Sequence, residues 1–499
     1  MPAISTDAAA YKSDNIISEE LRDSLRAAAA PLEDVPDRMK DWHPNSDEKV
    51  LDLVHPSLFP LLYGRTRILP DGAVPLEDCV KYIGKGEIMP TPKTEDLNVK
   101  SFPGLSAGNN LRLNKQHFYS DLFQWLPCEV AFPDNEEVKI TSYINNLPPK
   151  DYKPLYKAIE AIIARTLPMW DATLASTERN DRGNVKPRID IDEPEYTEPE
   201  GERPKQEDED QLDEDEIYEL DEEWHRANRI LTMPEPDSYS DHSPYQHPAL
   251  GEGHTFGRGE GAPPEKFGLR SLFEKEGLQI IVKLANIHLS PSKPSYDGGA
   301  WHIEGQLNEH ICASALYYYD SANISDSYLS FREATSVDDL SDKPYEQDDY
   351  QHLERLYGIE QHGAAVQTLG KVNTRQGRML TFPNVFQHRV EPFSLADPTQ
   401  PGHRKILALF LVDPYNRIPS TANVPPQQKE WWRKMVFELD RVGDLPPELA
   451  EHVVDSAGDF PIEMDEAKKI RLELMEERKM FVSDVEARVQ EETFSFCEH

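Results

Sequence analysis

The chain has 499 residues, a formal net charge of −38 and 38% hydrophobic residues, enough for a real core in one large domain or in two or three smaller ones. Phosphates would repel so acidic a chain, which argues against nucleic acid as a partner. Its four cysteines form no CxxC pair, its N-terminus shows no signal peptide, and its longest apolar run, residues 406–412, cannot span a bilayer. We therefore expect a soluble, cytoplasmic protein, with a nuclear location also open and no membrane partner.

The first 180 residues are expected to form a helix-rich N-terminal region. Residues 16–30 have helical spacing, and this helix is expected to end before Pro31. Residues 152–174 place four aliphatic side chains on one stripe, which predicts a second, amphipathic helix.

Residues 181–231 are expected to be an acidic, disordered insert. Residues 190–223 hold 19 acidic residues against Arg203 and Lys205, a net charge of −17. Such a run cannot bury enough apolar surface to offset the entropy of the chain. It could bind a basic partner, but a disordered insert is the preferred interpretation.

Residues 232–425 change in character and favour strands. Apolar and β-branched runs separated by turn signals predict strands at residues 278–289, 300–306, 311–319, 378–382, 385–390 and 404–412. A polar insertion at 320–374 contains a short helix near residues 350–357. Residues 426–499 read as a helical extension, with helices at 427–439 and 462–492. The expected fold class is α+β, with a jelly-roll or cupin-like double-stranded β-helix as its core.

Trp301-His302-Ile303-Glu304-Gly305 holds the first candidate metal ligands. The period of two in a strand sends His302 and Glu304 to one face and their neighbours to the other. Burying an imidazole and a carboxylate on an interior face is costly without a partner, and a metal would remove that cost. The alternative is a His–Glu hydrogen bond that faces solvent.

His388 and Arg404 extend this candidate site. Two imidazoles and one carboxylate are the ligand set of a facial-triad Fe(II) oxygenase, so His388 would complete the set begun by His302 and Glu304. Arg404 begins the most apolar strand candidate. Its guanidinium is what a dicarboxylate co-substrate such as 2-oxoglutarate would need, because it grips a carboxylate with two parallel hydrogen bonds. If Arg404 lies on the face of the strand that points away from the site, the neighbouring Lys405 would bind the co-substrate instead.

Other residues compete for these roles. Glu309 and His310 could replace part of the ligand set in a cupin-type site, although their spacing from His302 fits poorly. His352 also stands two residues before a glutamate, in a stretch that reads as an exposed helix, and we expect it to be a surface residue. Tyr317 and Tyr319 share one face of the next strand and could contact the co-substrate, unless they are core aromatics.

The motifs Asp41-Trp42-His43-Pro44, Trp301 to Gly305, Asn308-Glu309-His310 and Ala315 to Asp320 resemble a large, mainly fungal family known only as a domain of unknown function. The resemblance covers roughly residues 40 to 435. The C-terminal part is also similar to 2-oxoglutarate/Fe(II)-dependent dioxygenases, through His302, Glu304, His388 and Arg404. Two departures from that pattern are the glutamate in place of the commoner aspartate and the long His388-to-Arg404 spacing.

This second resemblance implies a non-haem Fe(II)- and 2-oxoglutarate-dependent oxygenase. His302, Glu304 and His388 would hold Fe(II), and Arg404 would bind the distal carboxylate of 2-oxoglutarate. The substrate would be a small molecule or a peptide. Two alternatives stay open: a non-catalytic β-barrel interaction protein, and a cupin-type metalloenzyme that uses no keto acid.

Overall fold

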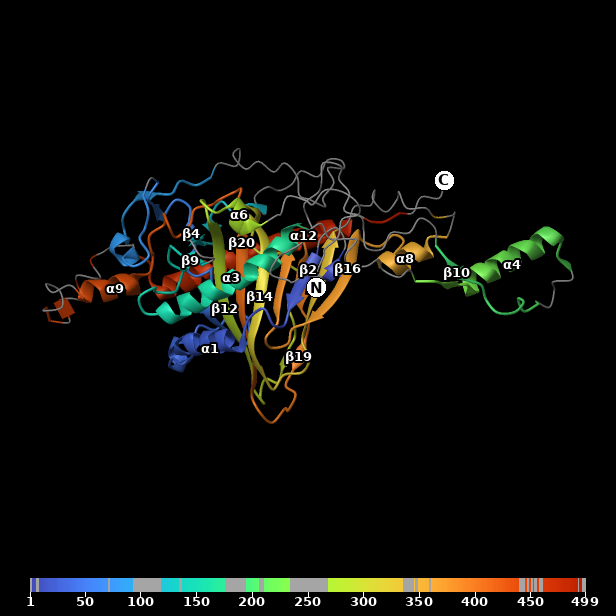
Figure 1. The fold of residues 1–499 in the computed structure, drawn as a ribbon, viewed down its shortest axis with the longest axis horizontal. Helices are drawn as coiled ribbons and strands as arrows, with labels where there is room; N and C mark the ends of the chain where they lie inside the picture. The colour runs from blue at the N-terminus through green and yellow to red at the C-terminus, as the bar shows by residue number, and fades with distance from the viewer. Residues whose placement is uncertain are drawn as a thin grey trace.

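The computed structural model describes residues 2–495 except 6–8, 71, 93–117, 134–136, 176–193, 206–210, 234–267, 335–344, 346–348, 359, 439–444, 447, 450–451, 453–455, 457–460 and 492. It is a mixed α/β fold with antiparallel sheets, drawn in Figure 1. Among the described residues, no helix is both long and apolar enough to cross a membrane.

The largest sheet has nine strands in the order β1-β2-β17-β14-β20-β12-β8-β9, with β3 also paired to β12. Its long central strands are β12 (Leu278–Leu289), β14 (Ile311–Ala322) and β20 (Gly402–Val412). The other strands are β1 (Pro2–Ser5), β2 (Ala9–Ser13), β3 (Val50–Val54), β8 (Cys128–Ala131), β9 (Lys139–Ile140) and β17 (Met379–Pro383).

Two helices, α1 (Glu19–Glu33) and α3 (Lys153–Ala175), cover one face of this sheet. Leu25 of α1 and Ile162 of α3 are fully buried and belong to the same core cluster as Leu407 and Leu409 of β20. The alternation of β20 therefore sends its odd-numbered leucines toward the helices. We call this side of the large sheet its helix face.

A three-stranded sheet lies against the opposite face of the large sheet. It consists of β15 (Tyr328–Ala334), β16 (Val366–Asn373) and β18 (Gln387–Val390). Phe331 of β15 packs in one cluster with Ile281, Ala408 and Phe410 of the large sheet. We call this cluster the inter-sheet core, because its side chains come from the facing sides of both sheets.

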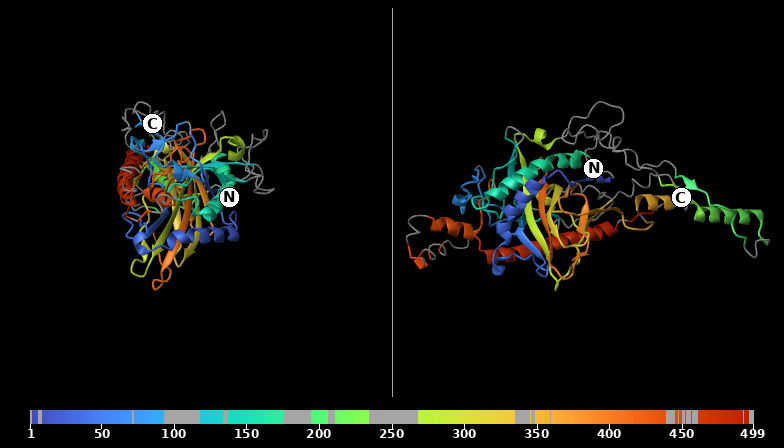
Figure 2. Two further views of the ribbon diagram at one scale, coloured as in Figure 1. Left: turned by 90° about the vertical axis from the view of Figure 1, so that its left-hand side faces the viewer. Right: turned by 60° about the horizontal axis from the view of Figure 1, so that its bottom comes forward.

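The C-terminal helices complete the molecule. Helix α9 (Lys429–Phe437) follows the sheets, and α12 (Met464–Glu491) runs on the side of the large sheet opposite α1 and α3 (Figure 2, left). Ile470 and Leu474 of α12 belong to the inter-sheet core. Arg478 binds the buried Glu309 at 2.5 Å, which anchors the middle of the helix.

Short elements connect these parts. Two-stranded pairs are formed by β4 (Leu61–Leu62) with β7 (Phe123–Gln124), β5 (Arg67–Ile68) with β6 (Glu87–Ile88), β10 (Tyr196–Thr197) with β11 (Ile230–Leu231), and β13 (Ser295–Tyr296) with β19 (Phe393–Ser394). The remaining α-helices are α4 (Glu214–Asn228), α6 (Leu269–Leu272) and α8 (Gln351–Tyr357), and the 3₁₀ helices are η1 (Asp37–Met39), η2 (Cys79–Tyr82) and η6 (Leu307–Glu309).

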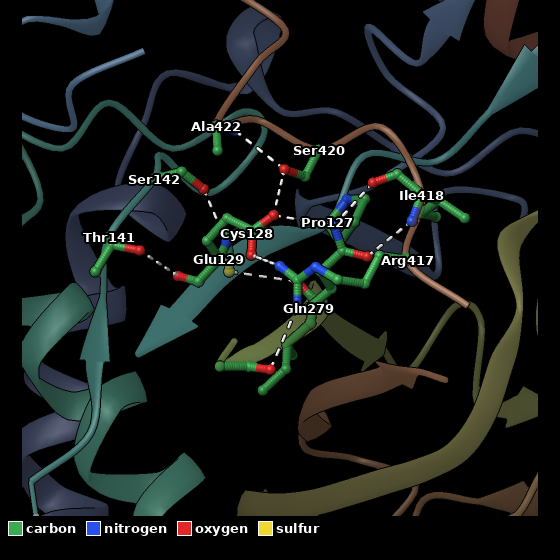
Figure 3. Close-up of polar contacts among 12 residues, drawn as sticks. Pro127, Cys128, Glu129, Thr141, Ser142, Gln279, Arg417, Ile418, Ser420 and Ala422 are labelled. Atoms are coloured by element: carbon green, nitrogen blue, oxygen red, sulfur yellow. Dashed lines mark hydrogen bonds and ion pairs between the residues drawn. The ribbon is translucent and has the colours of Figure 1, made fainter. Parts of the chain in front are cut away.

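The segment after β20 is fixed to the edge of the large sheet by a polar network around Glu129 (Figure 3). The Glu129 carboxylate accepts hydrogen bonds from Gln279 at 2.9 Å and from the Ser420 hydroxyl, and it pairs with Arg417. The backbone N–H of Glu129 donates to Ser142 at 2.8 Å. Because the Glu129 carboxylate is bound on several sides, this network has a structural role.

Most long elements lie close to the predicted positions. Besides α1 and α3, the N-terminal region contributes five short strands to the large sheet. Two expectations were wrong. The first helix continues through Pro31 to Glu33. His352 is buried in α8 rather than exposed, since this short helix packs its face with Leu353 into a small apolar cluster.

Part of the expected disordered insert is a helix. Helix α4 projects away from the body of the molecule (Figure 1) and begins with a capping box between Asp213 and Glu216. None of its residues is buried. We call the projecting segment from β10 to β11 the arm. Charged side chains of α4 pair with other residues of the arm, as in the ion pair between Arg203 and Asp221 at 2.7 Å. Capping and local ion pairs thus suffice for a helix despite the net charge, while residues 181–193 and 206–210 of the expected insert lie outside the described part of the chain.

Replacing residues 199–228 with a short Gly/Ser linker should change the melting temperature by no more than roughly 2 °C, because about 1 kcal/mol shifts it by only about 1 °C in a protein of this size. The ends of the replaced segment are adjacent, because Thr197 pairs with Ile230. Differential scanning calorimetry of both proteins measures the effect. A loss of more than about 10 °C would contradict the prediction and would indicate that the arm stabilises the core.

Candidate metal centre

The structure brings His302, Glu304 and His388 together. One ligand atom from each lies within 4.8 Å of the others. The Oε1 atom of Glu304 is 3.4 Å from Nε2 of His388 and 3.8 Å from Nε2 of His302, and the two imidazole centroids are 4.4 Å apart. We call these three residues the triad.

Backbone pairing sets this geometry. The N–H of His302 donates to the carbonyl of His388 at 3.1 Å, and the N–H of His388 donates back at 2.9 Å. The expected strand at residues 300–306 is reduced to this single antiparallel bridge. Directly opposed residues in an antiparallel pair project to the same face, so the bridge places both imidazoles side by side.

Asn384 holds Glu304 in position. Its side-chain oxygen accepts the N–H of Glu304 at 2.9 Å, and its amide nitrogen donates to the carbonyl oxygens of Glu304 at 2.8 Å and Ile311 at 3.0 Å. Gly305 follows with a φ of +73°, and a Cβ atom there would lie 2.6 Å from the carboxylate of Glu309. Only glycine fits this turn without strain. Asn384 stands between two strands as an ordinary turn residue, and no sequence pattern marks it as part of a site.

The protonation of the triad suits a divalent metal. Nδ1 of His302 lies 2.8 Å from the carbonyl oxygen of Ala300, which can only accept, so Nδ1 carries the proton and Nε2 presents a lone pair to the site. Burial and the neighbouring His388 lower the pKa of His302 to about 4. Burial opposes the ionisation of Glu304, but the hydrogen bond from His388 and the charges of His302, His388 and Lys283 outweigh it and lower the pKa to about 2. At neutral pH, His302 is thus a neutral imidazole and Glu304 a carboxylate, the forms that bind metal.

Arg404 lies beside the inter-sheet core, next to its member Tyr318, and is fully buried. One of its terminal nitrogens donates to the hydroxyls of Ser327 and Thr374, both at 3.1 Å, and the guanidinium stacks over Phe393 at 4.6 Å. The other terminal nitrogen and Nε have no hydrogen-bond partner. Within the described part of the chain, no carboxylate forms an ion pair with Arg404. Burial lowers the pKa of this group, as expected for a cation without a counter-ion.

Three competing assignments do not fit the structure. Lys405 points to the helix face and pairs with Glu33 at 2.7 Å, so it cannot replace Arg404. Glu309 is fully buried but already binds Arg478 and the N–H groups of Gln306 and Trp125. His310, next to it, is exposed.

The expectation that Tyr317 and Tyr319 contact the co-substrate is wrong. Both lie in the cluster of the helix face, and the Tyr319 hydroxyl donates to Asn286 at 3.2 Å. Tyr318 is the tyrosine of this strand that faces Arg404, with its ring centre 5.6 Å from the guanidinium carbon. The pairing of Tyr317 with Leu407 decides this, because cross-strand partners share a face and Leu407 belongs to the helix face.

A second group of metal-ligand side chains, His43, Asp52 and His55, does not suit a metal. Nδ1 of His55 accepts the N–H of Ser57 at 3.1 Å, and burial lowers the pKa of His55 well below its usual value. A neutral imidazole that accepts at Nδ1 carries its proton on Nε2, so His55 has no lone pair left for a metal. Asp52 is already bound by His43 at 2.8 Å and lies 3.5 Å from Arg471.

Comparison with known families gives one match over most of the chain. Residues 1–435 match the family described as "Protein of unknown function (DUF4246)". The chain belongs to this family. The match includes every residue of the triad and Arg404, and it ends before α12. The family name assigns no activity, and no curated protein matches the chain.

Solved structures show only limited similarity. One is the Fe(II)/α-ketoglutarate-dependent dioxygenase TqaL, with 11% identity, a TM-score of 0.17, and coverage of 28% of this chain and 43% of that one. Another is IDO from Bacillus thuringiensis, with 11% identity, a TM-score of 0.17, and coverage of 27% and 46%. A third is the oxalate decarboxylase of Lactobacillus farciminis, with 12% identity, a TM-score of 0.13, and coverage of 38% of this chain and 44% of that one. The chain spans less than half the length of each, and overlaps this small decide nothing about function.

Proposed function

We propose that this member of the family is a non-haem Fe(II)- and 2-oxoglutarate-dependent oxygenase, and that its two facing sheets form a double-stranded β-helix. The observation that carries the proposal is the buried Arg404, whose guanidinium has two nitrogens without a hydrogen-bond partner. Arg404 and His388 both contact side chains of the inter-sheet core. A buried charge without a partner is strongly destabilising. A ligand carboxylate would remove this cost.

The distance between Arg404 and the triad suits a dicarboxylate that spans them. Arg404 binds Ser327, the residue that immediately precedes β15. His388 pairs with Phe331 of β15, four residues further along the chain. Four residues of strand correspond to about 13 Å. Because the guanidinium of Arg404 already lies at Ser327, a bound 2-oxoglutarate and its contacts at both ends would span this length, with the distal carboxylate at the guanidinium and the keto-acid end at the metal.

Each residue has a distinct task in this proposal. Glu304 and the Nε2 atoms of His302 and His388 would hold the metal, and the carbonyl of Ala300 keeps the proton of His302 on Nδ1. Phe382, with its ring 4.8 Å from that of His388, and Phe331 form an apolar wall beside His388. When bound, Fe(II) would supply the oxidation chemistry through the positions that a three-ligand site leaves open to O₂ and the keto acid.

The direct test measures metal and keto acid together. The protein, loaded with Fe(II) without oxygen, should bind about one metal per chain and then 2-oxoglutarate, and on exposure to O₂ should form succinate slowly even without substrate. Metal binding without binding of 2-oxoglutarate or formation of succinate would favour a cupin-type metalloenzyme. Absence of metal binding would favour the non-catalytic interaction protein.

A further inference from the structure

Lys283 stands out on β12. It is the only Lys, Arg, Asp or Glu in the twelve residues of Leu278–Leu289. Ile281, two residues earlier, belongs to the inter-sheet core, and side chains two apart on a strand share a face. Lys283 therefore projects from the large sheet toward the side where the triad lies.

The strand registers place Lys283 at the level of the triad. On the large sheet, Arg404 pairs with Ile287, four residues from Lys283 along β12. On the three-stranded sheet, Arg404 binds Ser327, four residues from the Phe331 that pairs with His388. Lys283 and His388 are thus displaced from Arg404 by the same strand length, about 13 Å, on facing sheets.

Lys283 has no partner among the residues that the structure describes, with which it forms neither a hydrogen bond nor an ion pair. Asp52 lies on the neighbouring β3, but its carboxylate binds His43 and Arg471 instead. Arg471 in turn pairs with Asp41 at 2.7 Å. Oδ1 of Asp52 has no hydrogen-bond partner, but the charges of Asp41 and Asp52 are matched by those of Arg471 and of Lys468, which lies 3.7 Å from Asp41.

The charges around the site leave one positive charge without a counter-ion. Arg404 and Lys283 carry one positive charge each and Glu304 one negative charge, which sums to +1. A divalent metal and 2-oxoglutarate, a dianion, cancel each other. The site would then remain at +1 at the position of Lys283, which is half-buried, and an anion beside it would compensate this charge.

We infer that Lys283 binds an anionic group of the primary substrate, a carboxylate or a phosphate, beside the metal. This inference rests on the proposed function and adds the class of substrate to it. The anion would hold one end of the substrate on the large sheet while the bond to be oxidised faces the metal. An ammonium suits this role because it binds either oxyanion as a compact point charge.

Two small anions test the inference without knowledge of the substrate. The full-length protein, loaded with Mn(II) and an unreactive 2-oxoglutarate analogue, is titrated with inorganic phosphate and, separately, with trifluoroacetate. Bound close to Mn(II), these anions should show saturable paramagnetic relaxation of their ³¹P and ¹⁹F signals. The stronger of the two responses would identify the oxyanion that the site prefers. Lys283→Gln should weaken the binding of that anion by roughly tenfold or more, and Lys283→Arg should largely retain it.

Lys371→Gln is the matched control. Lys371 lines a cavity of about 590 Å³ on the outer side of the three-stranded sheet, together with Trp301, Arg332 and Arg389. This variant should leave the relaxation unchanged. Anion binding that is lost in Lys371→Gln and retained in Lys283→Gln would overturn the inference. So would unchanged binding in Lys283→Gln with a lower melting temperature, which would make Lys283 a structural counter-ion of Asp52.

Calorimetric titration of the metal-free protein with the same anions separates this inference from the proposed function. Anion binding that depends on Lys283, in a protein that binds no Mn(II), would refute the oxygenase and support the anion site. Binding of Mn(II) and of the 2-oxoglutarate analogue, with anion affinity equal in the wild type and in Lys283→Gln, would support the oxygenase and refute the anion site.

Discussion

Arg404→Met should weaken the binding of 2-oxoglutarate by roughly 30- to 1,000-fold, because a desolvated pair of hydrogen bonds between arginine and a carboxylate contributes on the order of 2–4 kcal/mol. Arg404→Lys should restore only part of this affinity, since an ammonium cannot form the planar fork. Metal binding should stay nearly intact in both variants. Calorimetric titration of the Mn(II)-loaded proteins with 2-oxoglutarate measures the change.

The ligand-free stability of Arg404→Met distinguishes a binding role from a structural one. Removing a buried, unpaired charge should leave the melting temperature unchanged or raise it. The hydroxyls of Ser327 and Thr374 would still bind each other. Lys405→Gln, a change of the neighbouring cation on the helix face, should not alter the affinity for 2-oxoglutarate. Loss of affinity in Lys405→Gln, or unfolding of Arg404→Met without ligand, would refute the role proposed for Arg404.

His302→Ala, Glu304→Ala and His388→Ala should each weaken metal binding by at least about 100-fold, because even residues that only orient a metal ligand are worth 10–100-fold. Each substitution leaves two ligands, too few to hold Fe(II) against water. Mn(II) binding, followed by the loss of the free-ion EPR signal, provides the measurement. The melting temperature of wild-type protein should rise with Mn(II), and that of the three variants should not.

His310→Ala is the control for this series. His310 is exposed and eight residues from His302, so its loss should not change the affinity for metal. Wild-type affinity in all three triad variants would show that the metal, if one binds, lies elsewhere. A selective loss in His310→Ala would return the competing ligand pair Glu309 and His310 to consideration.

Local periodicity was sufficient to predict the long elements and much of the candidate site. The alternation of β20 separates Arg404 and Phe410 from Lys405 and Leu407, and this division agrees with the two clusters in the structure. His302 and Glu304 also share a site, although a single bridge rather than a strand aligns them. These features depend on neighbours in the chain, which is where sequence patterns are most informative.

Features that depend on pairing between distant strands were not predicted. Choosing Tyr318 over Tyr317 and Tyr319 requires the register between β14 and β20, which also contains an irregularity between Tyr318 and Asp320. Strands as short as β8 and β9 have too few residues to show a period, so the N-terminal contribution to the large sheet was missed. Lys283 is visible in the sequence as the one charge in an apolar strand. Its proposed role could not be predicted, because that requires knowing which residues of the three-stranded sheet face it.

Because α12 lies near the end of the chain, it joins the fold after the two sheets. All triad residues precede residue 389, whereas Ile470 and Leu474, which belong to the inter-sheet core, come much later. A chain is made from its N-terminus and folds in part as it emerges from the ribosome. The two sheets can therefore pair, and the triad can assemble, while the apolar surface that α12 covers is still open to water. That surface stays exposed until residues 464–491 have been synthesised, and it is then a natural binding site for a chaperone.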